Sequence, residues 1–357
     1  MATGDFHEKP FDEGTLTKLK IFELYAQEWI PVFTSSAEPA FSEVHLFDFF
    51  SGPGTDSSAV YGSPLRILDQ LRRYQRQGMA GWSKVRIVAH LFDGQKAKID
   101  SLKQTLAEAN WKIPSVTIDP QTIKFTDALE AHREILENTR AAKLLIIDQF
   151  GVDEVTDQVF KRLINFPTTD FIFFLSSSTL HRFRDHPAIK MKIDKPEDSY
   201  DVHRAAFDYF RNLAPPHVFL GRFSIRKRSN IYGLIFGSQH PLGVHKFLRV
   251  AWANDQIAGE ANFDIERENI AAGELMLAME ELRPNKVREF EADLEAALRV
   301  GKMKSEADLL HFCIEAGMTC QHCTSVLQKL KREHVIECNF RTPDVRNFRN
   351  PRLLQVT

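Results

Sequence analysis

The sequence is poor in cysteine, and this scarcity excludes several architectures. Four cysteines occur in 357 residues, and all of them lie within the last 45. A fold held by disulfides is therefore excluded, and unpaired thiols indicate a reducing cytoplasm. The first 312 residues offer no thiol that could act as a nucleophile. Any chemistry in that part of the chain must depend on other side chains.

Long apolar runs are also missing. Runs such as 144–147 and 171–175 have the length of buried strands and are far too short to cross a bilayer. The first 13 residues are polar and lack the apolar core of a secretion signal. We therefore expect a cytoplasmic protein without a membrane anchor.

Neither sign of charge is in clear excess. Lys and Arg number 46 against 48 Asp and Glu, and a net charge of −2 argues against nucleic-acid binding. The total hides a cancellation, however, because segment 260–300 carries −6, whereas 180–228 carries +5 and 324–357 carries +4. Clustered cations of this kind can contact phosphates. The candidates are Arg226, Lys227, Arg228, Lys331, Arg341, Arg346 and Arg349.

Strand-like and helix-like segments alternate along most of the chain. Buried strands are expected at 44–50, 85–92, 116–118, 144–147 and 171–175, with helices between them. Repeated units of this kind predict a parallel, doubly wound α/β sheet of the Rossmann-like type. Segments 217–225 and 231–236 then predict a terminal antiparallel hairpin. A plain dinucleotide-binding dehydrogenase does not predict that ending, but the core of a class I S-adenosylmethionine (SAM) methyltransferase does.

Composition suggests four parts of the chain. Residues 1–40 are expected to form an N-terminal helical segment and residues 41–255 the α/β domain. Residues 256–303 are acidic and are expected to form a helical connector. Residues 304–357 resemble a small winged helix, with two helices followed by two short strands and a loop rich in Arg, Asn and Pro.

A glycine-rich turn follows the first predicted strand. In Asp48-Phe-Phe-Ser-Gly-Pro-Gly54, the glycines allow the backbone to approach a ligand closely. The spacing D-x-F-x-G-x-G resembles the first SAM-binding motif of class I methyltransferases. The alternative is a tight turn in which glycine is needed only for backbone geometry. The predicted cofactor-binding residues here are Asp48, Phe50, Ser51, Gly52, Gly54 and Ser63.

Two further acidic residues close predicted strands. Asp93 ends the second strand, where a carboxylate can accept hydrogen bonds from ribose hydroxyls. A solvated carboxylate in a turn is the alternative. Asp148-Gln-Phe-Gly151 ends the fourth strand and resembles the fourth motif of amine methyltransferases. Asp148 and Phe150 are therefore the predicted catalytic residues, although Gln149 and Gly151 stand where that motif has prolines.

Together these segments resemble the bacterial three-Cys-motif partner family, which itself resembles class I SAM-dependent methyltransferases. The resemblance covers about residues 15–255 and also includes Lys18-Leu-Lys-Ile-Phe-Glu-Leu-Tyr25 with Trp29, Gly62-Ser-Pro-Leu65, and Phe236-Gly-Ser-Gln-His-Pro-Leu-Gly243 with Phe247 and Trp252. One departure is Gln121-Thr-Ile-Lys-Phe125, which stands where methyltransferases often have Asp or Asn near the adenine. The resemblance implies a methyltransferase-like fold and SAM as cofactor.

Two functions remain open at this stage. The first is a SAM-dependent methyltransferase that acts on a nucleic acid or on a bound partner macromolecule. The second is a non-catalytic nucleic-acid-binding or regulatory partner that keeps a methyltransferase-like shell. Because the core lacks cysteine, thiol addition to a pyrimidine is excluded as a route to methylation at C5.

The four C-terminal cysteines are potential metal ligands. Cys313, Cys320, Cys323 and Cys338 have the spacing C-x6-C-x2-C-x14-C, which matches no established zinc pattern. We expect small buried cysteines in a winged-helix core and no metal. His181, His186, His203 and His240 show no ligand spacing either. The oligomeric state and the identity of a partner protein do not follow from the sequence.

Overall fold

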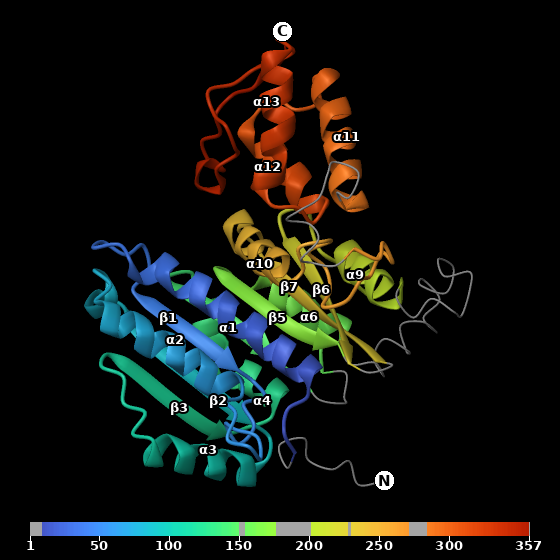
Figure 1. Cartoon of the computed structure of the whole chain (residues 1–357). Helices are drawn as coiled ribbons and strands as arrows, with labels where there is room; N and C mark the ends of the chain where they lie inside the picture. Colours follow the sequence, from blue (N-terminus) through green and yellow to red (C-terminus); the bar gives the residue numbers. More distant parts are fainter. Residues whose placement is uncertain (1–8, 150–153, 176–200, 228–229, 271–283, 357) are drawn as a thin grey trace. The chain divides into compact units, whose positions relative to one another are not determined.

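The computed structural model describes residues 9–149, 154–175, 201–227, 230–270 and 284–356. The chain forms two compact units, Met1–Gln239 and His240–Thr357. None of the helices in the described ranges combines the length and the apolar character needed to cross a membrane. Figure 1 shows the elements of both units.

The first unit contains the sheet and the helices that cover it. Its strands are β1 (Glu43–Asp48), β2 (Arg86–Asp93), β3 (Val116–Thr122), β4 (Ala141–Ile147), β5 (Thr169–Leu175), β6 (Phe219–Lys227) and β7 (Asn230–Ser238). Its α-helices are α1 (Glu13–Thr34), α2 (Ser63–Gln77), α3 (Lys96–Glu108), α4 (Phe125–Ala131), α5 (Arg133–Glu137), α6 (Asp157–Asn165) and α9 (Asp201–Leu213), with a 3-10 turn, η2 (Trp82–Lys84).

The seven strands form one sheet in the order β3-β2-β1-β4-β5-β7-β6. Strands β1 to β5 are parallel, whereas β7 pairs antiparallel with both β5 and β6. The predicted fold class is therefore confirmed for a mostly parallel sheet with a terminal antiparallel hairpin. Because β1 lies between β2 and β4, the carboxyl ends of these three strands meet at one edge.

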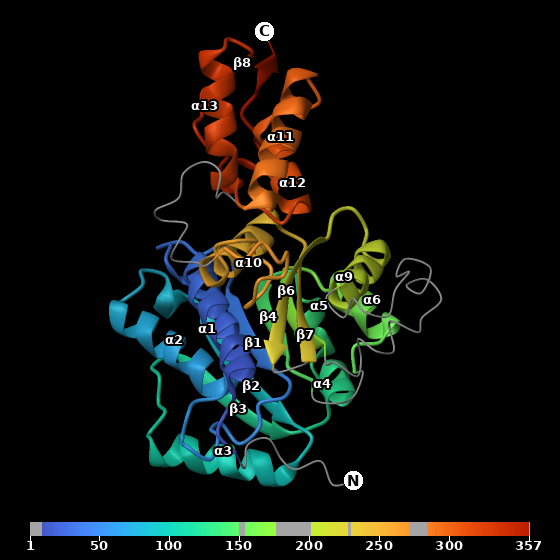
Figure 2. The same cartoon turned by 45° about the vertical axis from the view of Figure 1, so that its right-hand side comes forward.

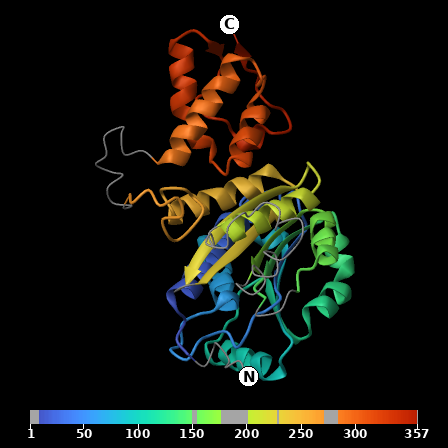
Figure 3. The ribbon, with the colours of Figure 1, turned by 90° about the vertical axis from the view of Figure 1, so that its right-hand side faces the viewer.

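Helices cover both faces of the sheet (Figures 2 and 3). Helices α1 and α2 lie side by side on one face, while α4, α5 and α6 lie on the other (Figure 3). The second face is rich in phenylalanine, and Phe47, Phe160, Phe171, Phe173 and Phe210 belong to one buried cluster there. Burial of such side chains is the main stabilising contribution to the fold, at roughly 25 cal/mol per Å² of apolar surface.

The second unit begins with α10 (Pro241–Asn254). It continues with α11 (Asn285–Arg299), α12 (Glu306–Glu315), the 3-10 turn η5 (Cys320–Cys323), α13 (Thr324–Arg332), β8 (Ile336–Glu337), a second 3-10 turn η6 (Val345–Asn347) and β9 (Gln355–Val356). Strands β8 and β9 pair antiparallel. Helix α12 begins with a capping box formed by Ser305 and Asp308. Leu294, Leu309 and Leu327 belong to the core of this unit.

The acidic connector expected at 256–303 is helical in only one of its described parts. Residues 285–299 form α11, but residues 256–270 contain no helix and consist of a turn, bends and irregular backbone. The Asp255 carboxylate explains this difference, because it accepts hydrogen bonds from the backbone N–H groups of four following residues: Ile257, Ala258, Glu260 and Ala261. Such bonds hold the backbone N–H groups in a turn instead of a helix.

Candidate functional site

Asp48 lies at the carboxyl end of β1 and is 1% exposed. Its Oδ1 accepts the Phe50 N–H at 3.2 Å, whereas Oδ2 has no hydrogen-bond partner among the described residues. Burial raises the pKa of this carboxyl to about 7, although hydrogen bonds from the Ser63 side chain and the Phe50 N–H oppose the shift. The charges of Asp148 and Asp93 add to the effect of burial. A buried carboxyl oxygen without a hydrogen-bond partner can accept a hydrogen bond from a ligand or pair with a cationic group.

The glycine-rich turn after β1 is held against β2 by hydrogen bonds. Ser51 donates its N–H to the Phe92 carbonyl at 2.8 Å and its hydroxyl to the Asp48 carbonyl at 3.1 Å. Gly52 and Gly54 have φ angles of 60° and 92°, which favour glycine. A Cβ on Gly54 would also lie 2.8 Å from the Leu102 side chain in α3. The backbone therefore favours glycine at both positions, and packing also requires it at Gly54.

Asp93 ends β2 and connects the turn to this strand. Its Oδ2 accepts the Gly52 N–H at 3.2 Å, and its Oδ1 accepts the Gln95 N–H at 2.8 Å. The Gly52 N–H is thus engaged within the protein. Each carboxylate oxygen of Asp93 has a second lone pair, so it can still accept a hydroxyl hydrogen bond. The structure therefore brings Asp48, Asp93 and the turn together at the strand ends.

The two remaining predicted cofactor residues lie beside the turn. Ser63 is the first residue of α2 and is buried, and the preceding Gly62 donates its N–H to the Gly54 carbonyl at 2.8 Å. Phe50 is half-buried, and its ring centroid lies 5.7 Å from that of Phe125. The Phe50 ring therefore contributes to local packing, whereas the Ser63 side chain lies close enough to Asp48 to oppose the rise in its pKa.

Asp148 follows β4 and forms an ion pair that the sequence analysis did not anticipate. The Lys18 Nζ in α1 lies 2.7 Å from the Asp148 Oδ1, and the two side chains are only 9% and 12% exposed. The same ammonium lies 4.5 Å from the centroid of the Phe174 ring. The sequence does contain a pattern that indicates burial of Lys18, because this residue shares a helical face with Phe22, Tyr25 and Trp29. A lysine on an apolar stripe needs a buried partner.

Gln149 has a structural role that accounts for its presence in place of a proline. Its side chain is 1% exposed and donates to the Phe174 carbonyl at 2.8 Å. Its Oε1 accepts the N–H groups of Glu154 at 2.7 Å and Val155 at 3.2 Å. The residue therefore connects the end of β4 to β5 and to the start of the next segment. Phe150, the other predicted catalytic residue, lies outside the described residues.

Several of the predicted phosphate-binding cations are engaged within the protein. Lys227 forms an ion pair with Asp12, with 2.6 Å between Nζ and Oδ2, and Asp12 also caps α1. Lys331 donates to the Phe340 carbonyl at 2.6 Å, and Arg346 binds both carboxylate oxygens of Asp344. Arg226, Arg341 and Arg349 are exposed, whereas Arg228 lies outside the described residues.

The cysteines of the second unit lie close together. The Cys313 and Cys323 sulfurs are 3.0 Å apart, and the Cys320 sulfur lies 3.7 Å from the His245 Nδ1. These three thiols are buried, as the sequence suggests, whereas the fourth, Cys338, is only half-buried. Hydrogen bonding to Cys313 lowers the pKa of Cys320 to about 6, and His245 contributes in the same direction.

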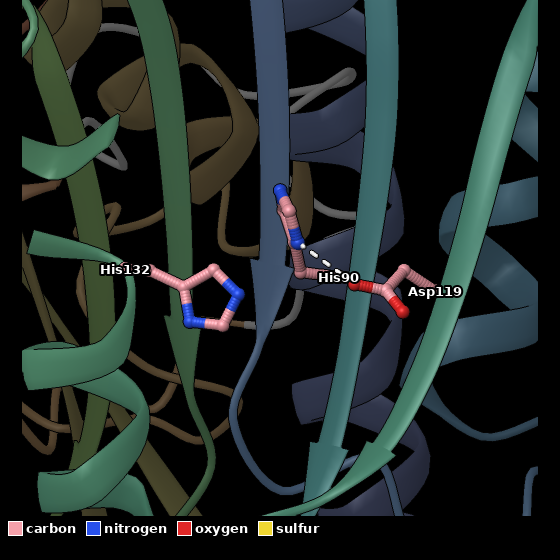
Figure 4. Close-up of side chains that lie close together, drawn as sticks. All are labelled: His90, Asp119 and His132. Carbon is pink, nitrogen blue, oxygen red and sulfur yellow. Dashed lines mark ion pairs between the residues drawn. The ribbon is translucent and has the colours of Figure 1, made fainter. Parts of the chain in front are cut away.

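Polar side chains also gather on the phenylalanine-rich face of the sheet, farther from the strand ends. His90 in β2 is 4% exposed and lies beside Asp119 of β3 and His132, which follows α4 (Figure 4). Burial lowers the pKa of His90 to about 3, so the ring is neutral. The sequence analysis missed this group because its members come from three separate elements.

The comparisons with known proteins find likenesses only among solved structures. No protein-family model matches the chain, and no curated protein matches it. An O-methyltransferase from Bacillus cereus in complex with S-adenosylhomocysteine (SAH) is 15% identical, with 62% of this chain and 80% of that chain covered and a TM-score of 0.34. The O-methyltransferase TomG from Streptomyces achromogenes, involved in tomaymycin synthesis and in complex with SAM, is 11% identical, with coverages of 64% and 89% and a TM-score of 0.33.

A SAM-dependent methyltransferase from Agrobacterium tumefaciens is 9% identical, with 64% of this chain and 62% of that chain covered and a TM-score of 0.34. TM-scores at this level do not bear on function. The strand order and the side-chain contacts of the chain itself are therefore the basis of the functional proposal.

Proposed function

We propose that the first unit is a SAM-dependent methyltransferase that binds its cofactor at the carboxyl ends of β1 and β2. The unpartnered Oδ2 of Asp48 is the observation that carries this proposal. SAM bears an ammonium group on its methionine end, and such a group would neutralise the buried carboxylate and complete its hydrogen bonding.

The neighbouring residues fit the rest of the cofactor. Asp93 has lone pairs left for two ribose hydroxyls, and the absence of side chains at Gly52 and Gly54 keeps the turn narrow. When bound, SAM supplies an already activated methyl group, so the protein needs mainly to align an acceptor. Asp148, held by Lys18, would orient an acceptor nitrogen or oxygen or take its proton.

A calorimetric titration with SAM and SAH tests the cofactor proposal. The wild-type protein is expected to bind both, and Asp93→Ala is expected to bind them about 100-fold more weakly, because two hydrogen bonds to a charged group are lost. Asp93→Asn serves as a second variant, because its remaining side-chain oxygen can still accept the Gly52 N–H and hold the turn. Exposed Asp293 provides a matched control as Asp293→Ala.

Two outcomes would contradict this proposal. If the wild-type protein binds neither SAM nor SAH, the cofactor assignment is wrong, and the non-catalytic alternative is favoured. If Asp93→Ala folds and keeps wild-type affinity, Asp93 does not contact the ribose.

We further propose that residues 304–357 form a winged helix that holds a nucleic acid. Support comes from the order α12, α13 and the antiparallel pair β8–β9, together with the exposed Arg341 and Arg349. The second helix would enter a groove, and the loop before β9 would contact phosphates. We also propose that the chain belongs to the three-Cys-motif partner family, on the motifs of residues 15–255, and that it acts with a partner protein. The four free thiols support a cytoplasmic location.

Salt dependence tests the nucleic-acid proposal. Duplex binding by the full chain is expected to weaken steeply between 50 and 200 mM salt, as phosphate contacts predict. Arg341→Ala/Arg349→Ala should weaken binding and reduce the salt slope by about 2. Lys20→Ala, an exposed cation of α1, is the control. Binding that is insensitive to salt, or unchanged in the double variant, would exclude these phosphate contacts.

A further inference from the structure

Three potential metal ligands meet on the face of the sheet that α4 and α5 cover. His90 and Asp119 are register partners in the parallel pair β2–β3, so their side chains project on the same face. The His90 Nδ1 lies 3.6 Å from the Asp119 Oδ2, and ligand atoms of these two residues and His132 all lie within 4.8 Å of one another. A tetrahedral zinc ion with bonds of about 2.1 Å separates its ligands by about 3.4 Å, which is close to the 3.6 Å between His90 and Asp119.

A chain of hydrogen bonds determines which nitrogen of His90 carries its hydrogen. The Glu43 carboxylate can only accept, so the His45 Nε2, 3.3 Å away, must donate to it. The His45 Nδ1 is then an acceptor, and the His90 Nε2, at 3.0 Å, must donate to it. The His90 Nδ1 is therefore a bare lone pair. It is buried, has no hydrogen-bond partner among the described residues, and faces the Asp119 carboxylate.

His132 presents a second bare nitrogen to the same point. Its Nδ1 lies 3.0 Å from the Ala128 carbonyl, which can only accept, so in the neutral imidazole Nδ1 carries the hydrogen and Nε2 is a lone pair. The group therefore contains two imidazole lone pairs and a carboxylate directed toward one another (Figure 4). Acceptors without a donor between them repel each other, and a bound cation removes the repulsion.

The two other protonation states of His90, with the hydrogen on Nδ1 or on both nitrogens, are less favourable. If the His90 Nδ1 donated to Asp119, the bare His45 Nε2 would face the Glu43 carboxylate. A doubly protonated His90 would place a charge on a ring that is 4% exposed and lies 4.2 Å from the Phe47 centroid. Neither arrangement satisfies all the buried groups.

We propose that His90, Asp119 and His132 bind a divalent transition-metal ion, with Zn²⁺ as the first candidate. Two histidines and one carboxylate form a common ligand set for such ions. The outer hydrogen bond of His132 to the Ala128 carbonyl fits as well, because metal-bound histidines usually donate their other N–H to a carbonyl or carboxylate. His90 donates to His45, which in turn donates to the Glu43 carboxylate. Gln121 likewise donates to the Asp119 Oδ2 at 2.6 Å.

The proposed ion would connect β2, the edge strand β3 and the turn between α4 and α5. His90 lies three residues before Asp93, which is about 10 Å along a strand, so the metal site is distinct from the proposed cofactor site. The Asp119 side chain is 35% exposed, which leaves a coordination position open to water.

Metal titrations of the full chain test this site. Protein treated with a chelator is expected to bind one Zn²⁺ at this site, and Asp119→Asn and His132→Gln should each lose that equivalent. The matched controls Asp127→Asn and His217→Gln, at exposed positions, should retain it. Glu43→Leu should weaken binding about 10-fold, because it removes the acceptor that fixes the hydrogen of His45 and, through His45, the hydrogen of His90.

Co²⁺ spectra separate this site from the thiols of the second unit. Nitrogen and oxygen ligands give visible absorption bands without the near-ultraviolet charge-transfer band of a thiolate, and Cys320→Ser should leave the visible bands unchanged. The proposal is overturned if the wild-type protein binds no Zn²⁺, if only thiolate bands appear, or if folded Asp119→Asn and His132→Gln bind like the wild type. SAM affinity of the chelator-treated protein reports separately on the cofactor proposal.

Discussion

Asp48→Asn is expected to stabilise the ligand-free protein at pH 8 and to weaken SAM binding. The pKa of Asp48 is about 7 in the folded protein against an ordinary value of 3.8, so the proton is held more tightly in the folded state. Its contribution to stability is therefore fully present below pH 3.8 and is lost as the pH rises through about 7. The difference corresponds to about 4 kcal/mol at pH 8, which the neutral amide would largely recover.

The same carboxylate makes SAM affinity depend on pH. Below about pH 7 the carboxyl is protonated and cannot pair with an ammonium, so affinity is expected to fall up to about 10-fold per pH unit. Above about pH 8 the ammonium itself loses its proton, and affinity falls again. Asp48→Asn removes the acidic limb of this profile.

Melting temperatures at pH 5 and pH 8, together with calorimetry in buffers of different ionisation enthalpy, measure both effects. The wild-type protein should release a proton when SAM binds at pH 6, whereas Asp48→Asn should not. Asp293→Asn, at an exposed position, is the control for both measurements. If Asp48→Asn melts at the wild-type temperature at pH 8 and binds SAM with wild-type affinity, Asp48 is not the cation-binding group.

Lys18→Met is expected to lower the free energy of unfolding by about 3 to 5 kcal/mol. The substitution leaves the Asp148 carboxylate buried without its cation, and an uncompensated buried charge is costly. The double variant Lys18→Met/Asp148→Asn should recover most of the lost free energy of unfolding, because it also removes the unpaired charge of Asp148. Lys20→Met is the matched control, since Lys20 lies on the same helix with a side chain that is 49% exposed.

Denaturant unfolding of the wild type, Lys18→Met, Asp148→Asn and the double variant gives the coupling energy of the pair. The pH profile of SAM binding adds a functional measurement, because the Asp148 charge raises the pKa of Asp48. Lys18→Met should therefore move the acidic limb to higher pH, and the double variant should move it back. Additive effects of the two substitutions would contradict a direct ion pair, as would an unchanged profile.

Part of the candidate site follows from the sequence alone, and part depends on the tertiary structure. Asp48, Asp93 and Asp148 each lie at or near the end of a predicted strand, and parallel strands place such residues at one edge of a sheet. Their proximity was predictable for this reason. The pairing of Asp148 with Lys18 was not, because the two residues are 130 positions apart and helical spacing identifies a buried face without identifying what lies against it.

Charge counts were a weaker guide than strand ends. Lys227 adds to the basic count of its segment, yet it pairs with Asp12 at the start of α1. Residues 256–270 have a composition compatible with a helix, but the Asp255 carboxylate captures their backbone N–H groups. In both cases one specific contact outweighs a regional average.

Sequence patterns that span about 20 residues were sufficient to predict the alternation of strands and helices, the glycine-rich turn and the terminal hairpin. These features depend on local backbone preference and on which side chains must be buried. The ion pair of Lys18, the hydrogen bonds of Gln149, and the meeting of His90 with Asp119 and His132 depend on tertiary structure. Strand register and the approach of α1 and α4 bring these side chains within a few ångströms, and no spacing along the chain encodes that distance.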